Sequence, residues 1–178
     1  MSVKNICNKD SVSLFKKTEN GINHFFFDYE FKDDRIINLV NNDLFNVVFK
    51  LNPELIEDIK IISKTDKDGC VILFFKDILK EIKIKKRFIC IDYVIQETNE
   101  YLIYKTIPSK KYEFPGYTSI EWNEALIMIT KPDHLNKTKF SCKFLIEEDE
   151  DVPIYVENTI GKLIKNVFIK LKFLIDTL

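Results

Sequence analysis

The chain has 178 residues, the length of one domain, and a domain of this size buries roughly 70% of its unfolded surface. Apolar residues make up 46% and charged residues 31%, values typical of globular proteins. The formal net charge of −1 creates no field that would attract nucleic acid, so we expect no nucleic-acid partner. The polar residues 1–11 are predicted to be irregular, and residues 12–178 to form a single, monomeric domain.

Four cysteines lie far apart in the sequence, at positions 7, 70, 90 and 142. Disulfide frameworks and zinc sites show closer or paired spacing, so this pattern predicts reduced thiols, with no metal or cofactor. No apolar run approaches the roughly 20 residues of a membrane span, and the first residues lack the apolar core of a signal peptide. We therefore expect a cytoplasmic protein.

The first third of the chain predicts a hairpin followed by helix. Two β-rich segments, residues 12–17 and 22–31, are separated by the turn sequence Glu-Asn-Gly at positions 19–21. Residues 33–40 begin with acidic side chains and continue with helical spacing. This favours a short helix pair that ends before Pro53.

Strands follow one another through the middle of the chain. Turn-forming residues separate apolar segments at residues 55–65, 70–76, 82–96, 101–107, 117–130 and 139–147. Several of these segments are apolar at consecutive positions, as in Phe-Ile-Cys-Ile at 88–91. Such runs indicate a sheet covered on both faces, one cover being a helix or a ligand.

The last segment, residues 153–178, predicts a long amphipathic helix. Apolar residues recur on one face with a period of 3.6, among them Leu163 and Val167. The acidic run 147–151 precedes the positive end of this helix, as its dipole favours. Ile169 and Phe173 lie opposite the apolar face among lysines, where they are predicted to contact a bilayer, a partner or the N-terminal segment.

Three short motifs, in this order, resemble the START family of lipid-transfer domains. The segment Lys-Arg-Phe-Ile at 86–89 is similar to the Arg-Asp-Phe entry of that family's long central strand. A proline-containing loop at 108–116 then leads into another long segment, and Asp-Val-Pro at 151–153 is followed by Asn158 on the last helix. The resemblance covers roughly residues 12–178. It implies an α+β helix-grip fold, in which a long curved antiparallel sheet wraps around the C-terminal helix.

The sequence departs from this pattern at the polar positions. Phe88 stands where the family usually has Asp, and Tyr93 stands where it often has a cavity Arg. On the preceding strand, Phe74 falls near the position where the family commonly has an acidic cavity residue. The family's long N-terminal helix is absent or very short. These changes indicate a more apolar pocket than one that binds a specific headgroup through a polar pair.

The predicted pocket lies on one face of the strand at 82–96, because alternate residues of a strand share a face. Broad apolar walls with one or two convergent polar groups suit a lipid, although the same pattern is typical of an ordinary core. The candidate cavity residues are Phe74, Arg87, Ile89, Ile91, Tyr93, Trp122, Leu163 and Val167.

The loop at 108–117 mixes lysines with aromatic residues. Aromatic rings suit the depth of lipid headgroups and lysines suit anionic lipid, so Lys110, Lys111, Tyr112 and Phe114 are predicted to contact a membrane transiently. An ordinary solvated loop with packed aromatics is the alternative.

We therefore expect lipid binding, with transfer between membranes, of one phospholipid, sterol or fatty acyl lipid. The alternative is an interaction module of the same fold whose interior is filled by its own side chains. Catalysis is not expected, because no nucleophile motif, P-loop or metal-ligand spacing is present.

Overall fold

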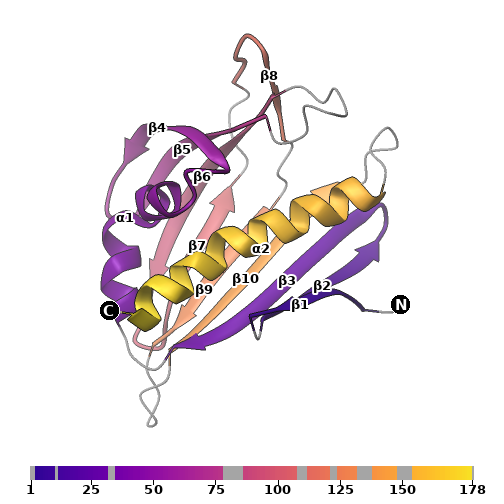
Figure 1. Cartoon of the computed structure of the whole chain (residues 1–178). Helices are drawn as coiled ribbons and strands as arrows, with labels where there is room; N and C mark the ends of the chain where they lie inside the picture. The colour runs from indigo at the N-terminus through magenta and orange to yellow at the C-terminus, as the bar shows by residue number, and fades with distance from the viewer. Residues whose placement is uncertain are drawn as a thin grey trace.

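The computed structural model describes residues 3–10, 12–31, 35–77, 86–107, 112–120, 124–131, 138–147 and 154–177. In these ranges the elements are β1 (Lys4–Lys9), β2 (Val12–Glu19), β3 (Ile22–Phe31), α1 (Arg35–Leu51), β4 (Ile56–Lys64), β5 (Asp68–Phe75), β6 (Lys86–Glu97), β7 (Tyr101–Ile107), β8 (Tyr117–Ser119), β9 (Glu124–Thr130), β10 (Thr138–Glu147) and α2 (Ile154–Thr177) (Figure 1).

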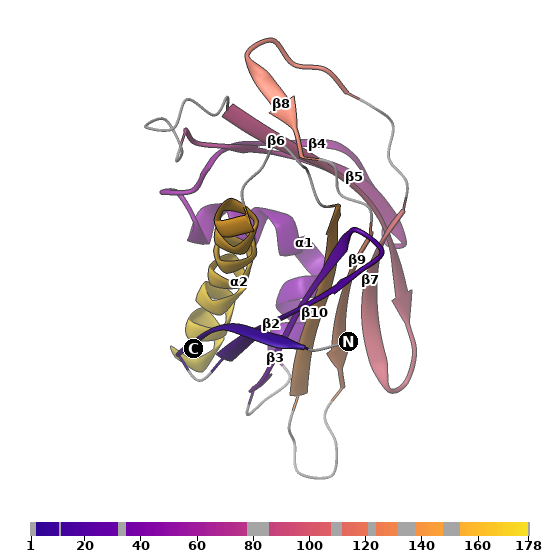
Figure 2. The ribbon, with the colours of Figure 1, turned by 90° about the vertical axis from the view of Figure 1, so that its right-hand side faces the viewer.

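The described strands form one sheet in the order β1-β2-β3-β10-β9-β7-β6-β5-β4, with β8 paired to β6 off this path. All pairs are antiparallel except β6–β8. Strand β10 lies between β3 and β9 and thereby joins the N-terminal hairpin to the later strands. The sheet bends around both helices, with α2 lying along β2 and β3 and against α1 (Figure 2). The predicted fold class, a curved antiparallel sheet around a C-terminal helix, is confirmed.

Alternation along the strands determines which side chains meet the helices. In β3, Phe25, Phe27, Tyr29 and Phe31 are buried, whereas the intervening residues from 24 to 30 are more exposed. The β10–β3 register places Phe140 opposite Tyr29, and their rings stack with centroids 4.8 Å apart. Such cross-strand aromatic pairs stabilise a sheet by about 0.5–1.5 kcal/mol each beyond the burial of their area.

The structure corrects several of the predicted elements. Residues 4–9 form the edge strand β1 instead of irregular chain, because β2 offers a free edge to pair with. A single 17-residue helix, α1, replaces the predicted pair. The segment 117–130 contains two strands, β8 and β9, and not one. Ile169 is buried in the core rather than exposed, although Phe173 is 49% exposed.

Neither α1 nor α2 has the length and apolarity of a membrane-spanning helix.

Candidate functional site

The inner face of the sheet carries three of the eight predicted cavity residues in its core. Ile89, Ile91 and Tyr93 alternate along β6, and all three are buried in the main hydrophobic core. The β5–β6 register adds Leu73 and Val71 opposite Ile89 and Ile91 on the same face. This part of the prediction is correct in placement: the three residues share one face, which turns toward the helices.

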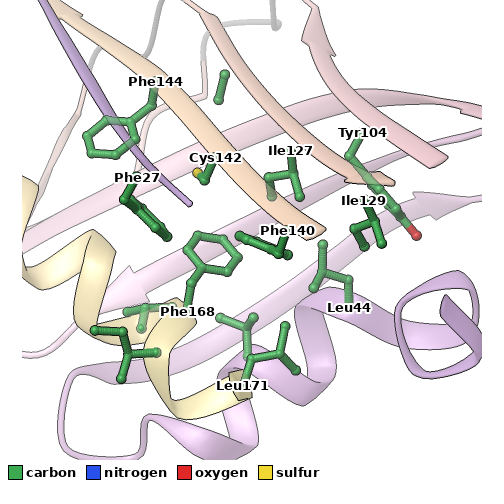
Figure 3. Close-up of a cluster of buried hydrophobic side chains, with 14 of the residues drawn as sticks. Phe27, Leu44, Tyr104, Ile127, Ile129, Phe140, Cys142, Phe144, Phe168 and Leu171 are labelled. Atoms are coloured by element: carbon green, nitrogen blue, oxygen red, sulfur yellow. The ribbon is translucent and has the colours of Figure 1, made fainter. Parts of the chain in front are cut away.

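Helix α2 covers the β3–β10 side of this face. Val167 belongs to the main core, and Leu163 packs against it while half-buried. Phe168 packs its ring over the paired strands β3 and β10, with its centroid 6.2 Å from that of Phe27 and 5.5 Å from that of Phe140 (Figure 3). These rings fix how far α2 stands from the sheet.

Helix α1 covers the β6–β7 side. The Phe45 ring lies 5.0 Å from that of Tyr93 and 6.4 Å from that of Tyr104. Tyr93 in turn packs on Gly69, where an added Cβ would come within 2.4 Å of the tyrosine hydroxyl oxygen. Gly69 is therefore required by the closeness of Tyr93 to the β5 backbone. The inner face is lined by two helices, and sequence reasoning missed the part played by Phe45 and Tyr104.

Among the described residues, few polar side chains are buried. The Tyr29 hydroxyl donates a hydrogen bond of 2.9 Å to the carbonyl oxygen of Phe168, and burial raises the pKa of this phenol well above its ordinary value. The Oδ1 atom of Asn158, on the first turns of α2, is buried and has no hydrogen-bond partner within the described ranges. An unsatisfied buried acceptor costs about 1–3 kcal/mol, so Asn158 offers a binding position for a donor group.

A buried lysine fixes the outer edge of the helix–sheet contact. Lys165 of α2 is fully buried, and its ammonium group donates to the carbonyl oxygens of Val12 at 3.0 Å and Lys9 at 3.4 Å. Its Nζ also lies 3.6 Å from the Cys7 sulfur. Because a buried cation requires such partners, Lys165 ties α2 to the turn between β1 and β2.

Phe74 does not join the predicted cavity. It alternates with Leu73 along β5 and therefore lies on the opposite, outer face of the sheet, in a second cluster with Ile72 and Phe88. The prediction of Phe74 as a cavity residue came from its resemblance to a family position and is wrong. Adjacent residues of a strand point to opposite faces, and Leu73 occupies the inner face.

Tyr112 and Phe114 also belong to this outer cluster. The Phe114 ring lies 4.9 Å from that of Phe74 and 5.0 Å from that of Phe88, in edge-to-face contacts. Tyr112 stacks on Phe114 with centroids 6.4 Å apart. Both side chains are half-buried against the sheet. This packing matches the alternative considered from the sequence, an ordinary loop with packed aromatic residues.

Of the remaining predicted residues, the structure describes only Arg87. Arg87 is half-buried on β6, beside Thr118 of β8. Trp122, Lys110 and Lys111 lie outside the described residues.

No protein-family model matches this sequence, and no curated protein matches it. Solved structures do match. Human StAR-related lipid transfer protein 5 aligns with a TM-score of 0.74 at 12% identity, over 98% of this chain and 85% of that chain. This chain has the START helix-grip fold.

Two further structures extend the comparison. A fragment of the STAR-related lipid transfer protein of Xanthomonas axonopodis aligns with a TM-score of 0.68 at 12% identity, covering 96% of this chain and 94% of that chain. The protein Ara h 8.0201 aligns with a TM-score of 0.51 at 11% identity, covering 89% of this chain and 100% of that chain. The similarity to START domains predicted from the sequence is thus confirmed as a likeness of fold along nearly the whole chain.

Proposed function

We propose that this chain binds one lipid between the inner face of its sheet and α2, and carries it between membranes. The observation that supports the proposal most directly is the START fold over 98% of the chain, shared with human StAR-related lipid transfer protein 5. A fold alone does not specify a function, so the proposal also depends on the chemistry of the interior.

That chemistry is apolar with isolated polar groups. Ile89, Ile91 and Val167 would contact the hydrocarbon part of a ligand, which gains about 25 cal/mol for each Å² of apolar surface removed from water. Asn158 would accept a hydrogen bond from a hydroxyl or amine of the ligand, because its buried oxygen has no partner in the described chain. This combination favours a lipid with a small polar end over a strongly charged headgroup.

Exchange of such a ligand requires α2 to move away from the sheet. In addition to the aromatic ring contacts, α2 is held by the Tyr29–Phe168 hydrogen bond and by the hydrogen bonds from Lys165 to Val12 and Lys9. A membrane surface would lower the free-energy cost of moving α2 away from the sheet, because the apolar faces that this movement exposes would contact acyl chains instead of water. As parts of the same proposal, the protein acts as a monomer in the cytoplasm, docks transiently on membranes and catalyses no reaction.

The direct test is the identification of what the protein carries. Full-length protein purified without detergent would be extracted with organic solvent, and the extract analysed by mass spectrometry. One lipid class at a near-stoichiometric amount is expected. A lipid-free protein that also takes up no fluorescent lipid from vesicles would instead support the interaction module with a filled interior.

A variant that narrows the interior tests the location of the ligand. Ile91→Phe adds ring volume on the inner face, whereas Ile61→Phe adds the same volume at a position of β4 that is 47% exposed. If a lipid occupies the space, Ile91→Phe should lower lipid occupancy and vesicle transfer with little change in the melting temperature of the lipid-free protein. If side chains fill the space, Ile91→Phe should instead destabilise the lipid-free protein by about 1–3 kcal/mol through overpacking. Ile61→Phe should change neither measurement.

A further inference from the structure

Two cysteines and an aspartate meet on the outer face of the sheet, away from the proposed lipid site. The β5–β6 register pairs Cys70 with Asp92 and Ile72 with Cys90, so that Cys90 is the diagonal neighbour of Cys70. The two sulfur atoms are 3.7 Å apart, and one ligand atom from each of Cys70, Cys90 and Asp92 lies within 4.8 Å of the others. The residues are far apart in sequence, and only the pairing of the strands brings them together.

The separation of the sulfur atoms fits one metal ion. Zn²⁺ binds thiolate sulfur at about 2.3 Å with tetrahedral angles, which places two sulfur ligands about 3.8 Å from each other. A carboxylate oxygen is a common third ligand of the same ion. Three protein ligands of this kind, two of them sulfur, favour a thiophilic cation over Mg²⁺ or Ca²⁺, which take oxygen ligands.

We propose that Cys70, Cys90 and Asp92 form a zinc site. The Tyr112 hydroxyl oxygen lies 4.0 Å from the Cys70 sulfur. A water molecule or this phenol oxygen would supply the fourth ligand. The site does not depend on the proposed lipid function. It would join the segment around Tyr112 to the paired strands β5 and β6, against which that segment packs through the aromatic contacts of the outer cluster.

Binding is an exchange of protons for metal. Each of the two thiols releases its proton to solvent when its sulfur binds Zn²⁺. The resulting thiolates and the Asp92 carboxylate carry three negative charges, two of which the ion neutralises. The ion thereby offsets the cost of ionising a thiol in a partly buried site.

Cobalt(II) is the probe for this site, because thiolate ligation gives it charge-transfer absorption in the near ultraviolet that carboxylate or imidazole ligation lacks. The untagged, full-length protein would be titrated with Co²⁺ under reducing conditions. Two thiolates per bound ion are expected, with Zn²⁺ displacing the cobalt and raising the melting temperature of the protein. A titration without charge-transfer absorption would overturn the proposal and leave the pair as hydrogen-bonded thiols.

Variants identify the ligands. Cys70→Ser and Cys90→Ser should each weaken Co²⁺ binding by more than about 100-fold, because outer-shell partners alone contribute 10- to 100-fold. Cys7→Ser, a cysteine outside the cluster, should leave binding and spectrum unchanged. Asp92→Asn keeps the shape of the side chain and removes its charge. This variant tests the site even if a serine variant fails to fold. Co²⁺ binding to Asp92→Asn as tight as to the wild type would exclude the carboxylate as a ligand, and with it the three-residue site.

Discussion

At the scale of single residues, Gly161 sets the distance between α2 and β3. A Cβ at this position would lie 2.7 Å from Cε1 of Phe25 and 3.4 Å from a methyl carbon of Leu14. Phe25 is fully buried and stacks on Phe144 with ring centroids 5.3 Å apart, so a shift of its ring would disturb other core contacts. The absent side chain is therefore part of the packing between helix and sheet.

Replacing Gly161 tests this contact. Alanine favours a helix over glycine by about 1 kcal/mol, whereas forcing extra volume into a packed core costs about 1–3 kcal/mol. We expect Gly161→Ala to lower the free energy of unfolding, measured by urea denaturation, by about 1 kcal/mol, the middle of the overpacking range less the gain in helix propensity. Lys162→Ala, at the next and exposed position, should change it by less than about 0.5 kcal/mol. A Gly161→Ala protein as stable as the wild type would show that α2 can shift outward without loss.

Residue-level prediction succeeded where periodicity is sufficient and failed where it is not. Ile89, Ile91 and Tyr93 were placed on one face because a strand alternates with a period of two. The prediction for Phe74 is on the wrong face, because the register between β5 and β6 depends on long-range strand pairing that the sequence alone does not reveal. Cys70 and Cys90 likewise gave no signal in the sequence, since twenty positions separate two residues that β5 and β6 bring into contact.

At the scale of elements, one lysine connects α2 to the end of α1. Lys170 donates a hydrogen bond of 3.1 Å to the carbonyl oxygen of Leu51 and forms an ion pair with Glu54. The hydrogen bond from the Lys170 ammonium holds the pKa of Glu54 below its ordinary value. The Lys170 side chain is 39% exposed and that of Glu54 60%, so solvent screens the pair and it contributes well below 1 kcal/mol.

This ion pair predicts a small pH-dependent term in stability. Because the pKa of Glu54 is lowered by folding, its contribution is present above the unfolded pKa, about 4.3, and disappears as pH falls through the lower, folded value. Glu54→Gln should therefore be slightly less stable than the wild type at pH 7 and indistinguishable from it well below pH 4. Paired urea denaturation curves across this range measure the difference. A gap that persists at low pH would assign the effect to packing instead of charge.

The order and type of most elements could be predicted, because strand alternation and helical spacing are local signals. The edge strand β1 could not, since residues 4–9 are polar and become a strand only through pairing with β2. Lys165 illustrates the same limit within α2. A lysine among helical lysines indicates solvent, yet carbonyl groups of the β1–β2 turn accept its hydrogen bonds in the interior. Tertiary partners decide both cases.

At the scale of the molecule, α2 supplies a large share of the core. Val167, Phe168, Ile169, Leu171 and Ile175 are all buried on it. At about 1.5–3 kcal/mol each, their burial is comparable to the whole net stability of a typical domain, about 5–15 kcal/mol.

A chain truncated after Asp151 should therefore lack a folded state and not merely an open one. Its circular dichroism should show no cooperative thermal transition, while the full-length chain melts in a single step. Cooperative melting of the truncated chain near the full-length temperature would mean that the sheet is stable without the helix it surrounds.

The exposed side of α2 presents an aromatic ring to solvent, which bears on how the protein would deliver a lipid to a membrane. Phe173 is 49% exposed, and its neighbour Lys172 is half-buried and pairs with Asp176 one turn later. If α2 opens at a membrane as proposed, an exposed aromatic ring on it suits the membrane interface. Phe173→Ser should slow lipid transfer between vesicles several-fold and weaken vesicle binding, but leave the amount of bound lipid unchanged, because the ring points away from the interior. Phe173→Leu, which keeps an apolar side chain, should retain most of the transfer rate. Equal transfer by the serine variant and the wild type would exclude this face of α2 as the docking surface, and a loss of bound lipid would place Phe173 in the closure of the interior.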